Sequence, residues 1–127
     1  MSIQKFITER LKITSKTKSL RVKPTSYSEL KVIIDKELKR QGPDADLNFI
    51  DTSEITDMSK LFDLLHVENI KIDEWDVSNV TDMSFMFMNQ DKFSCDLSGW
   101  DVSKVTKHEY AFLGCYKMQP KFRPNFK

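Results

Sequence analysis

The stretch DEWDVSNVTDMSFMF, residues 73–87, places acids and hydroxyls beside large apolar side chains and recurs along the chain. Three segments align without gaps, DTSEITDMSKLFDLLHVENIKIDEW (51–75), DVSNVTDMSFMFMNQDKFSCDLSGW (76–100) and DVSKVTKHEYAFLGCYKMQPKFRPN (101–125). A half-repeat, DLNFIDTS (46–53), precedes them. A unit this short cannot bury its apolar face alone, so neighbouring units are expected to share one core.

Each unit carries two apolar periodicities. Around WDVS, residues 75–78, apolar and polar residues alternate with a period of two, which is typical of a short strand. From Val80 onward the spacing is helical, and this stripe comprises Val80, Met83, Met86 and Phe87. Thr81 and its equivalents Thr56 and Thr106 are predicted to cap these helices. Each unit is therefore expected to fold as strand, tight turn, short helix and return loop.

The segment ahead of the repeats predicts a longer helix over 26–41. Ser26 and Glu29 have the spacing of a capping box, and Gly42 followed by Pro43 is a stop signal. The apolar residues of this segment fall on one helical face, as expected for a helix that covers the first unit.

Weaker signals flank that helix. IQKFITERLKI (3–13) has helical spacing, and SLRVKP (19–24) is a candidate strand. Pro120 and Pro124 are expected to prevent a further strand from pairing at the other end. The predicted divisions are an N-terminal cap over 1–45 (basic arm and helix 26–41), repeats over 46–113, and a C-terminal cap or tail over 114–127.

The unit WDVSNVTDMSFMF, followed by DLSGWDVS, closely resembles the BspA-like leucine-rich repeat family, which includes mycoplasma lipoprotein-associated repeats. The resemblance covers 46–113 and is strongest over 75–103. It implies an α/β repeat fold, a short leucine-rich-repeat-like solenoid of about 2.5 to 3 units of 25 residues with a helical N-terminal cap. It also implies a protein-binding role without catalytic residues. The front segments IQKFITERLKIT and SELKVIIDKELKRQG also look like a cap on short repeat proteins of Bacteroidales bacteria and their phages.

Charge is distributed unevenly along a chain whose net charge is +1. Residues 1–25 carry seven basic residues and one acidic residue (+6), residues 51–100 carry three and eleven (−8), and residues 101–127 carry six and two (+4). Any preference for a charged partner is therefore local. The N-terminus lacks the apolar run of a signal peptide, and no later stretch approaches transmembrane length. We expect a cytoplasmic protein without a membrane partner, in the host cytoplasm if it is phage-encoded.

The polar residues predict no catalytic, cofactor or metal site. The Asp, Ser and Thr columns recur in register, whereas a catalytic carboxylate pair needs two different environments, so these columns are predicted to make turns. His66 and His108 lack a neighbouring nucleophile, and Cys95 and Cys115 lack metal-ligand spacing. Both cysteines are expected to be buried thiols. We therefore expect a protein that is not an enzyme.

The leading hypothesis is a non-enzymatic module that binds another protein through the outer strand face of the solenoid. The exposed ladder on that face is expected to comprise Glu74, Asp76, Ser78, Gly99, Asp101 and Ser103. Trp75 and Trp100, which alternate with aspartate, are predicted core residues, and an exposed aromatic ladder is the alternative.

Two other functions remain open at this point. The acidic body is compatible with a phage-encoded inhibitor of a host nucleic-acid-binding defence enzyme. The basic N-terminal arm and the tail CYKMQPKFRPNFK (115–127), where bases alternate with aromatics, are compatible with a nucleic-acid-binding or virion-associated protein, which is less favoured.

Overall fold

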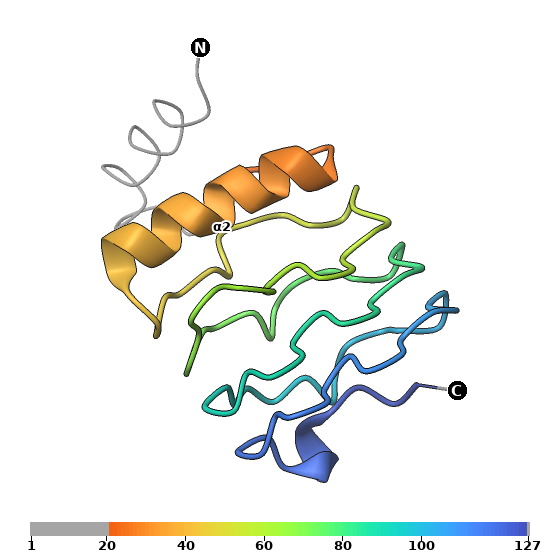
Figure 1. Ribbon diagram of the computed structural model, residues 1–127. Coiled ribbons are helices and arrows are strands. Elements are labelled where there is room, and N and C mark those ends of the chain that lie inside the picture. The colour runs from red at the N-terminus through yellow and green to blue at the C-terminus, as the bar shows by residue number, and fades with distance from the viewer. Residues whose placement is uncertain (1–20, 127) are drawn as a thin grey trace.

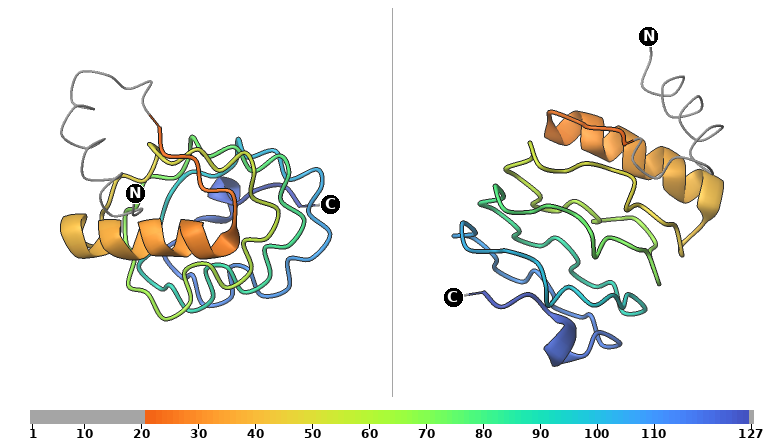
Figure 2. Two further views of the ribbon diagram at one scale, coloured as in Figure 1. Left: turned by 90° about the horizontal axis from the view of Figure 1, so that it is seen from above. Right: turned by 180° about the vertical axis from the view of Figure 1, so that it is seen from behind.

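The computed structural model describes residues 21–126. One α-helix, α2 (Tyr27–Gln41), crosses one end of a series of irregular layers, and the short 3-10 helix η1 (Pro120–Phe122) lies at the opposite end (Figure 1). Seen from above, α2 runs across layers that overlie one another (Figure 2). The helix expected over 3–13 lies outside the described residues. Of the strand expected over 19–24, the described part forms only a single bridge, between Val22 and Ile50.

The helix expected over 26–41 is confirmed as α2. The Ser26 side chain accepts a hydrogen bond from the Glu29 backbone N–H at 3.2 Å, as its capping-box position predicts. The Gly42 N–H closes the other end on the Leu38 carbonyl at 2.8 Å, with φ of 87°. Its buried face consists of Leu30, Ile33, Ile34 and Glu37. The helix therefore lays one face on the layers below it.

The expected α/β repeat, a short leucine-rich-repeat-like solenoid, is wrong. Residues 21–126 contain α2 and η1 as their helices and no β-strand, and β-pairing between segments is limited to four isolated parallel bridges. The segment 72–80, expected to contain a strand, consists of two successive turns, closed by Trp75 N–H on the Ile72 carbonyl and by Val80 N–H on the Val77 carbonyl. The alternation of buried and exposed residues comes from these turns.

The helices expected after Thr56, Thr81 and Thr106 are also absent. Each unit instead has residues of positive φ at two fixed places, and an α-helix cannot continue through them. The first set is Lys60, Phe85 and Tyr110, with φ of 57°, 60° and 57°, and the second is Leu64, Asn89 and Gly114, with φ of 64°, 65° and 82°. The members of each set occupy equivalent positions in successive units, so the repeat encodes a turn at these places.

Backbone hydrogen bonds between units explain why the helix does not form. In a helix the Phe87 N–H would bond to the Met83 carbonyl, but here it donates to the Ala111 carbonyl at 2.9 Å. The predicted threonine caps also bond between units, since Thr81 N–H donates to the Thr56 carbonyl at 2.8 Å. Backbone N–H groups that would bond within a helix therefore donate to carbonyls of the neighbouring unit.

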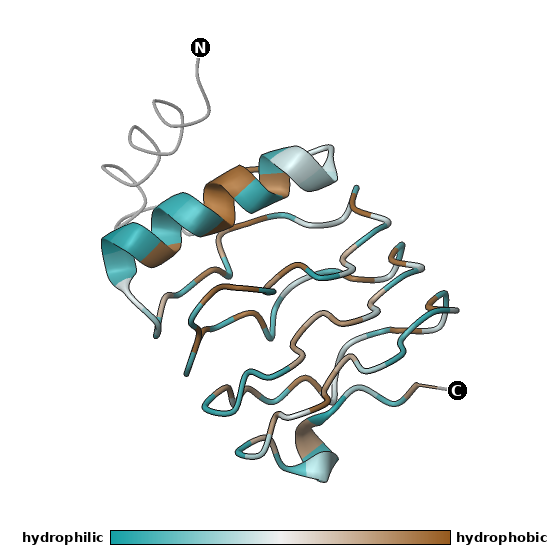
Figure 3. Cartoon of the chain, viewed as in Figure 1, coloured by the Kyte–Doolittle hydropathy of each residue, from teal (hydrophilic) through white to brown (hydrophobic). Residues whose placement is uncertain are grey.

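The apolar stripe is nevertheless buried as predicted, because the turns direct the same side chains inward. Phe62, Phe87 and Phe112 stack in a column with ring centroids 5.0 and 5.3 Å apart. Trp75 and Trp100 lie parallel, with centroids 6.5 Å apart, and are almost fully buried. Figure 3 shows hydrophobic and hydrophilic residues alternating over short distances along the layers. No helix in the described part of the chain is both long and apolar enough to cross a membrane.

Candidate functional site

The six predicted binding residues lie at the surface, in the turn segment 72–80 and in its equivalent in the next unit, 97–105. We call this set, Glu74, Asp76, Ser78, Gly99, Asp101 and Ser103, the acidic face. All are exposed except Ser78, which is half-buried. Because the turns 72–75 and 77–80 recur 25 residues later at 97–100 and 102–105, the structure brings equivalent residues of successive units to neighbouring layers. Whether they bind a partner stays a prediction.

Each aspartate of the acidic face closes its own turn. The Asp76 carboxylate accepts the Ser78 N–H at 3.0 Å and the Ser78 hydroxyl at 2.6 Å. The Asp101 carboxylate accepts the Ser103 N–H at 3.0 Å. These are Asx turns, in which a short acidic side chain replaces a backbone acceptor. The prediction that the Asp and Ser columns make turns is confirmed.

Hydrogen bonds of this Asx-turn type also shift the pKa values of the aspartates that accept them. Those from the hydroxyl and N–H of Ser98 lower the pKa of Asp96, and those from Ser103 lower the pKa of Asp101. Desolvation alone would raise the pKa of Asp51, but hydrogen bonds from Ser53 and nearby basic side chains bring it below its ordinary value. These three turn carboxylates are therefore charged at neutral pH.

Polar side chains also connect one layer to the next beside the acidic face. Asn48 Oδ1 accepts the Glu74 N–H at 3.0 Å, and Arg21 lies 3.9 Å from the Glu74 carboxylate. The Asn79 side chain donates to the Ser53 carbonyl at 2.9 Å. These contacts hold the backbone that carries the acidic face.

The other side chains that the sequence singled out, the tryptophans and the two histidines, contact neighbouring parts of the fold. The indole N–H of Trp75 donates to the Leu47 carbonyl at 2.8 Å, so the exposed aromatic ladder is excluded. His66 pairs with Glu68 at 2.8 Å. The His108 ring instead stacks on Phe126, with centroids 4.3 Å apart.

Both cysteines are free thiols. Cys115 is buried as predicted and donates to the Phe87 carbonyl at 2.9 Å, whereas Cys95 is only half-buried. Burial raises the pKa of both thiols, which keeps them protonated at neutral pH. Within residues 21–126, no group of three or more His, Cys, Asp or Glu side chains could hold a metal ion.

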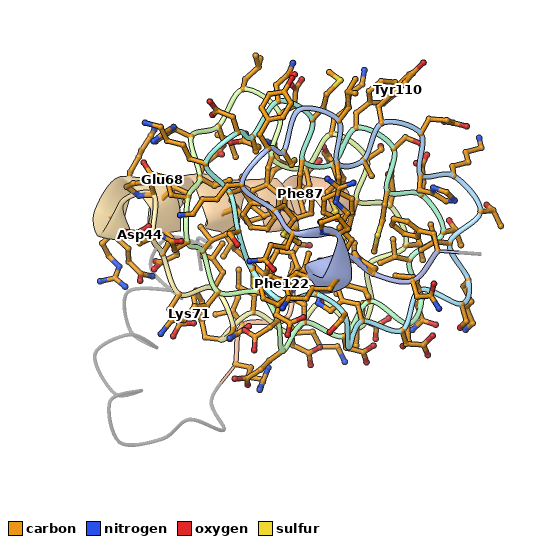
Figure 4. The ribbon with its side chains drawn as sticks, turned by 90° about the horizontal axis from the view of Figure 1, so that it is seen from below. Asp44, Glu68, Lys71, Phe87, Tyr110 and Phe122 are labelled. Atoms are coloured by element: carbon orange, nitrogen blue, oxygen red, sulfur yellow. The ribbon has the colours of Figure 1, made fainter. Side chains whose placement is uncertain are left out.

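Sequence reasoning missed a hollow at the C-terminal end, between the third unit and the tail. Its volume is about 640 Å³, and its walls include Tyr110, Leu113, Tyr116 and Arg123. In Figure 4, which views this end, Tyr110 lies at the outer edge of the molecule while Phe87 and Phe122 lie near its centre. The repeat could have indicated this site, because residues 21–126 contain no further unit whose carbonyls accept the backbone donors of the third unit.

A family described as "Mycoplasma protein of unknown function, DUF285" matches residues 35–125 of the chain. The match spans the helix α2 from Asp35 onward, all three units and most of the tail. Comparison with the curated proteins and with the solved structures finds no match.

Proposed function

This chain belongs to the DUF285 family of Mycoplasma proteins of unknown function, and we propose that it is a non-catalytic module that binds another protein through its acidic face. The finer relation to BspA-like repeats is part of the proposal, and the gapless recurrence of one unit over 51–125 supports it. The proposal does not include a leucine-rich-repeat fold.

The observation that carries the proposal is the fixed geometry of the carboxylates. Asp76 and Asp101 are exposed, yet a backbone N–H holds each of them in one orientation. A charged group that is ordered before binding loses little conformational entropy on binding, so its contact with a partner costs less. Flexible surface acids lack this advantage.

Charge indicates the class of partner. Residues 51–100 carry eleven acidic and three basic residues, a net charge of −8. The negative charge of this segment favours encounter with a basic protein surface, and the attraction weakens with salt. The inhibitor alternative uses the same face, with the basic site of a nucleic-acid-binding enzyme as the target.

The test is affinity capture from the native host with three forms of the protein. The test variant, Asp76→Asn with Asp101→Asn, removes two charges but keeps an oxygen that can accept the serine N–H. The control variant, Asp57→Asn with Asp91→Asn, removes two charges from exposed residues outside the acidic face. A partner of this face is recovered with the wild type and the control and lost with the test variant.

The proposal fails if every captured protein is recovered equally with the test and control variants. For a captured partner, binding is then measured against increasing salt and with added DNA. Competition by DNA identifies the target as a nucleic-acid-binding protein, as the inhibitor alternative requires.

A further inference from the structure

One edge of the third unit carries a row of backbone donors that have no acceptor among residues 21–126. In the second unit, alternate residues donate across to the third: Met83, Phe85, Phe87 and Asn89 bond to the carbonyls of Lys107, Glu109, Ala111 and Leu113 at 2.7–2.9 Å. The equivalent N–H groups of the third unit belong to His108, Tyr110, Phe112 and Gly114. None of these four has a hydrogen-bond partner among residues 21–126. We call this row the open edge.

The opposite end of the molecule is closed by side chains of α2. The carbonyl of Ser59 has no backbone donor from a preceding unit within residues 21–126 and accepts a hydrogen bond from the Tyr27 hydroxyl at 2.8 Å. The carbonyl of Leu61 accepts the Lys31 ammonium at 2.9 Å. Unpaired backbone groups at an edge are a template for pairing, and at this end the helix pairs these two carbonyls. No described residue does the same for the open edge.

Large apolar side chains gather beside the open edge. Tyr110, Leu113 and Tyr116 are 59%, 53% and 88% exposed, and they line the hollow of about 640 Å³. They are three of the five exposed large hydrophobic residues within residues 21–126. Exposed apolar groups that cluster around unpaired backbone groups mark an interaction surface.

The charge at this end has the opposite sign to the acidic face. Residues 101–127 carry six basic and two acidic residues. Arg123 lines the hollow, and its buried Nε atom has no hydrogen-bond partner among the described residues. The same guanidinium lies 5.5 Å from the Phe112 ring, which fixes its position. The whole end therefore presents donors and positive charge.

We propose that the open edge binds an acidic peptide segment of another protein. Alternate carbonyls of the peptide accept hydrogen bonds from the N–H groups of the open edge. The apolar side chains of the peptide contact Tyr110, Leu113 and Tyr116. Its carboxylates face Arg123 and the lysines of residues 101–127. The second and third units already pair in this two-residue step, and both follow turns with positive φ at Phe85 and Tyr110, so the bound peptide takes the same turned path. Addition of a chain to a free edge is a known mode of peptide recognition.

Two other occupants fit less well. A second copy offers the same donors at its own open edge, and its row of carbonyls is covered by α2. A nucleic acid would find positive charge, but the apolar wall and the two-residue spacing of the donors suit a peptide backbone. Both occupants are distinguishable outcomes of the experiment.

The experiment uses the full chain and a fluorescent peptide of alternating glutamate and leucine with blocked ends. Fluorescence anisotropy measures its affinity, and a peptide with lysine in place of glutamate is the charge control. Tyr116→Ser is expected to weaken binding of the acidic peptide about tenfold, because it removes an exposed anchor. Leu64→Ser is the matched control: Leu64 is 96% exposed, lies outside the hollow, and its loss should leave the affinity unchanged.

Amide hydrogen exchange followed by NMR tests the open edge itself. In the free protein the four amides of the open edge should exchange faster than their equivalents at Met83, Phe85, Phe87 and Asn89. Saturation with the acidic peptide should slow exchange of the four amides about tenfold or more. The proposal is overturned if the peptide binds without slowing them, if the lysine peptide binds equally well, or if an oligonucleotide displaces the peptide.

Sedimentation of the free protein completes the test, since a dimer that buries Tyr116 would identify a second copy as the occupant and overturn the proposal. The inference is independent of the acidic face. The Asp76→Asn, Asp101→Asn variant should bind the acidic peptide like the wild type, so failure of one proposal leaves the other standing.

Discussion

At the scale of single residues, each Asp-x-Ser triplet of the repeats uses its carboxylate to accept the N–H of the serine two residues on. The distances lie between 2.8 and 3.1 Å, and the pairs are Asp51–Ser53, Asp57–Ser59, Asp76–Ser78, Asp82–Ser84, Asp96–Ser98 and Asp101–Ser103. The stretch DEWDVSNVTDMSFMF, residues 73–87, is therefore built mainly from turns. The exposed acids of this stretch can contact a partner only in the orientation that these turns impose.

The pKa of Asp96 should rise toward its ordinary value of 3.8 in Ser98→Ala, because the hydroxyl that donates at 2.6 Å is lost. Carboxyl titration by NMR measures this change. A folded pKa below the unfolded value stabilises the protein above that value, and this stabilisation disappears as pH falls through the folded pKa. Ser98→Ala should therefore be less stable than the wild type to urea at neutral pH, and the difference should shrink in acid. An equal difference at both pH values would contradict this account.

Gln90 is a buried polar residue at a position where the other units have Leu65 and Cys115. Its amide donates to the carbonyls of Phe62 and Leu65 at 2.8 and 2.6 Å. Gln90→Leu should lower the free energy of unfolding by about 1–3 kcal/mol, because buried carbonyls lose their donor although the apolar volume is kept. Urea unfolding gives the value. An unchanged midpoint would mean that water replaces the amide.

At the scale of elements, the turns with positive φ replace the helices that the apolar spacing predicts. Leu64 has φ of 64° and is 96% exposed, in a column that has Asn89 in the second unit and Gly114 in the third. At Gly114 a Cβ would lie 2.7 Å from Asn89 Oδ1 and 3.1 Å from Asn89 Cα, so a side chain there would displace Asn89 in addition to opposing the positive φ. The turn is thus fixed by its place between units, and Leu64 adopts it against its own preference.

Leu64→Gly should stabilise the protein by about 1 kcal/mol, because glycine adopts positive φ without the steric penalty of a side chain. Thermal unfolding measures the gain. Leu64→Ala is the matched control, since it removes the same exposed side chain but keeps the penalty. A gain in both variants would assign the effect to the exposed leucine.

The contacts of α2 with the first unit give a second prediction at this scale. Tyr27→Phe removes the hydroxyl that donates to the Ser59 carbonyl and should cost about 1 kcal/mol in unfolding free energy. Burial, with Asp57 and Asp63 nearby, raises the pKa of Tyr27, so the donor stays protonated at neutral pH. Val32→Ala, at an exposed position of the same helix, should cost much less in the same urea titration. Equal costs would show that the helix is held by its apolar face alone.

At the scale of the whole molecule, one apolar core runs from α2 to the C-terminal tail. Phe87 lies in its middle, between Phe62 and Phe112 and 4.4 Å from Phe93 by ring centroids. Phe87→Ala should cost about 3–5 kcal/mol, a large share of the stability of a small domain. Tyr110→Ala, at the rim, should cost far less. Calorimetry that found two separate transitions would contradict a single shared core.

Much of this arrangement was predictable from the order of residues. The repeat and its period, the buried stripe of Val80, Met83, Met86 and Phe87, the turn-making aspartates and the helix α2 all follow from residue type and spacing. These features depend on side chains and their immediate neighbours, for which local rules hold. The alternation of Asp76 and Ser78 with the apolar residues Trp75 and Val77 likewise predicted that the acidic face lies at the surface.

The backbone path within each unit could not be predicted in this way. An apolar stripe at Val80, Met83 and Phe87 fits a helix and a chain of turns equally well, because both turn the same side chains inward. The choice is made by hydrogen bonds between units, since the Phe87 N–H has an acceptor on Ala111 that a single unit does not contain. Residue type and spacing thus specify which residues are buried, where α2 begins and ends, and which aspartates make turns. The backbone conformation and the open edge arise only when the units pack together, because the N–H groups of one unit find their acceptors on the next, and those of the open edge find none among residues 21–126.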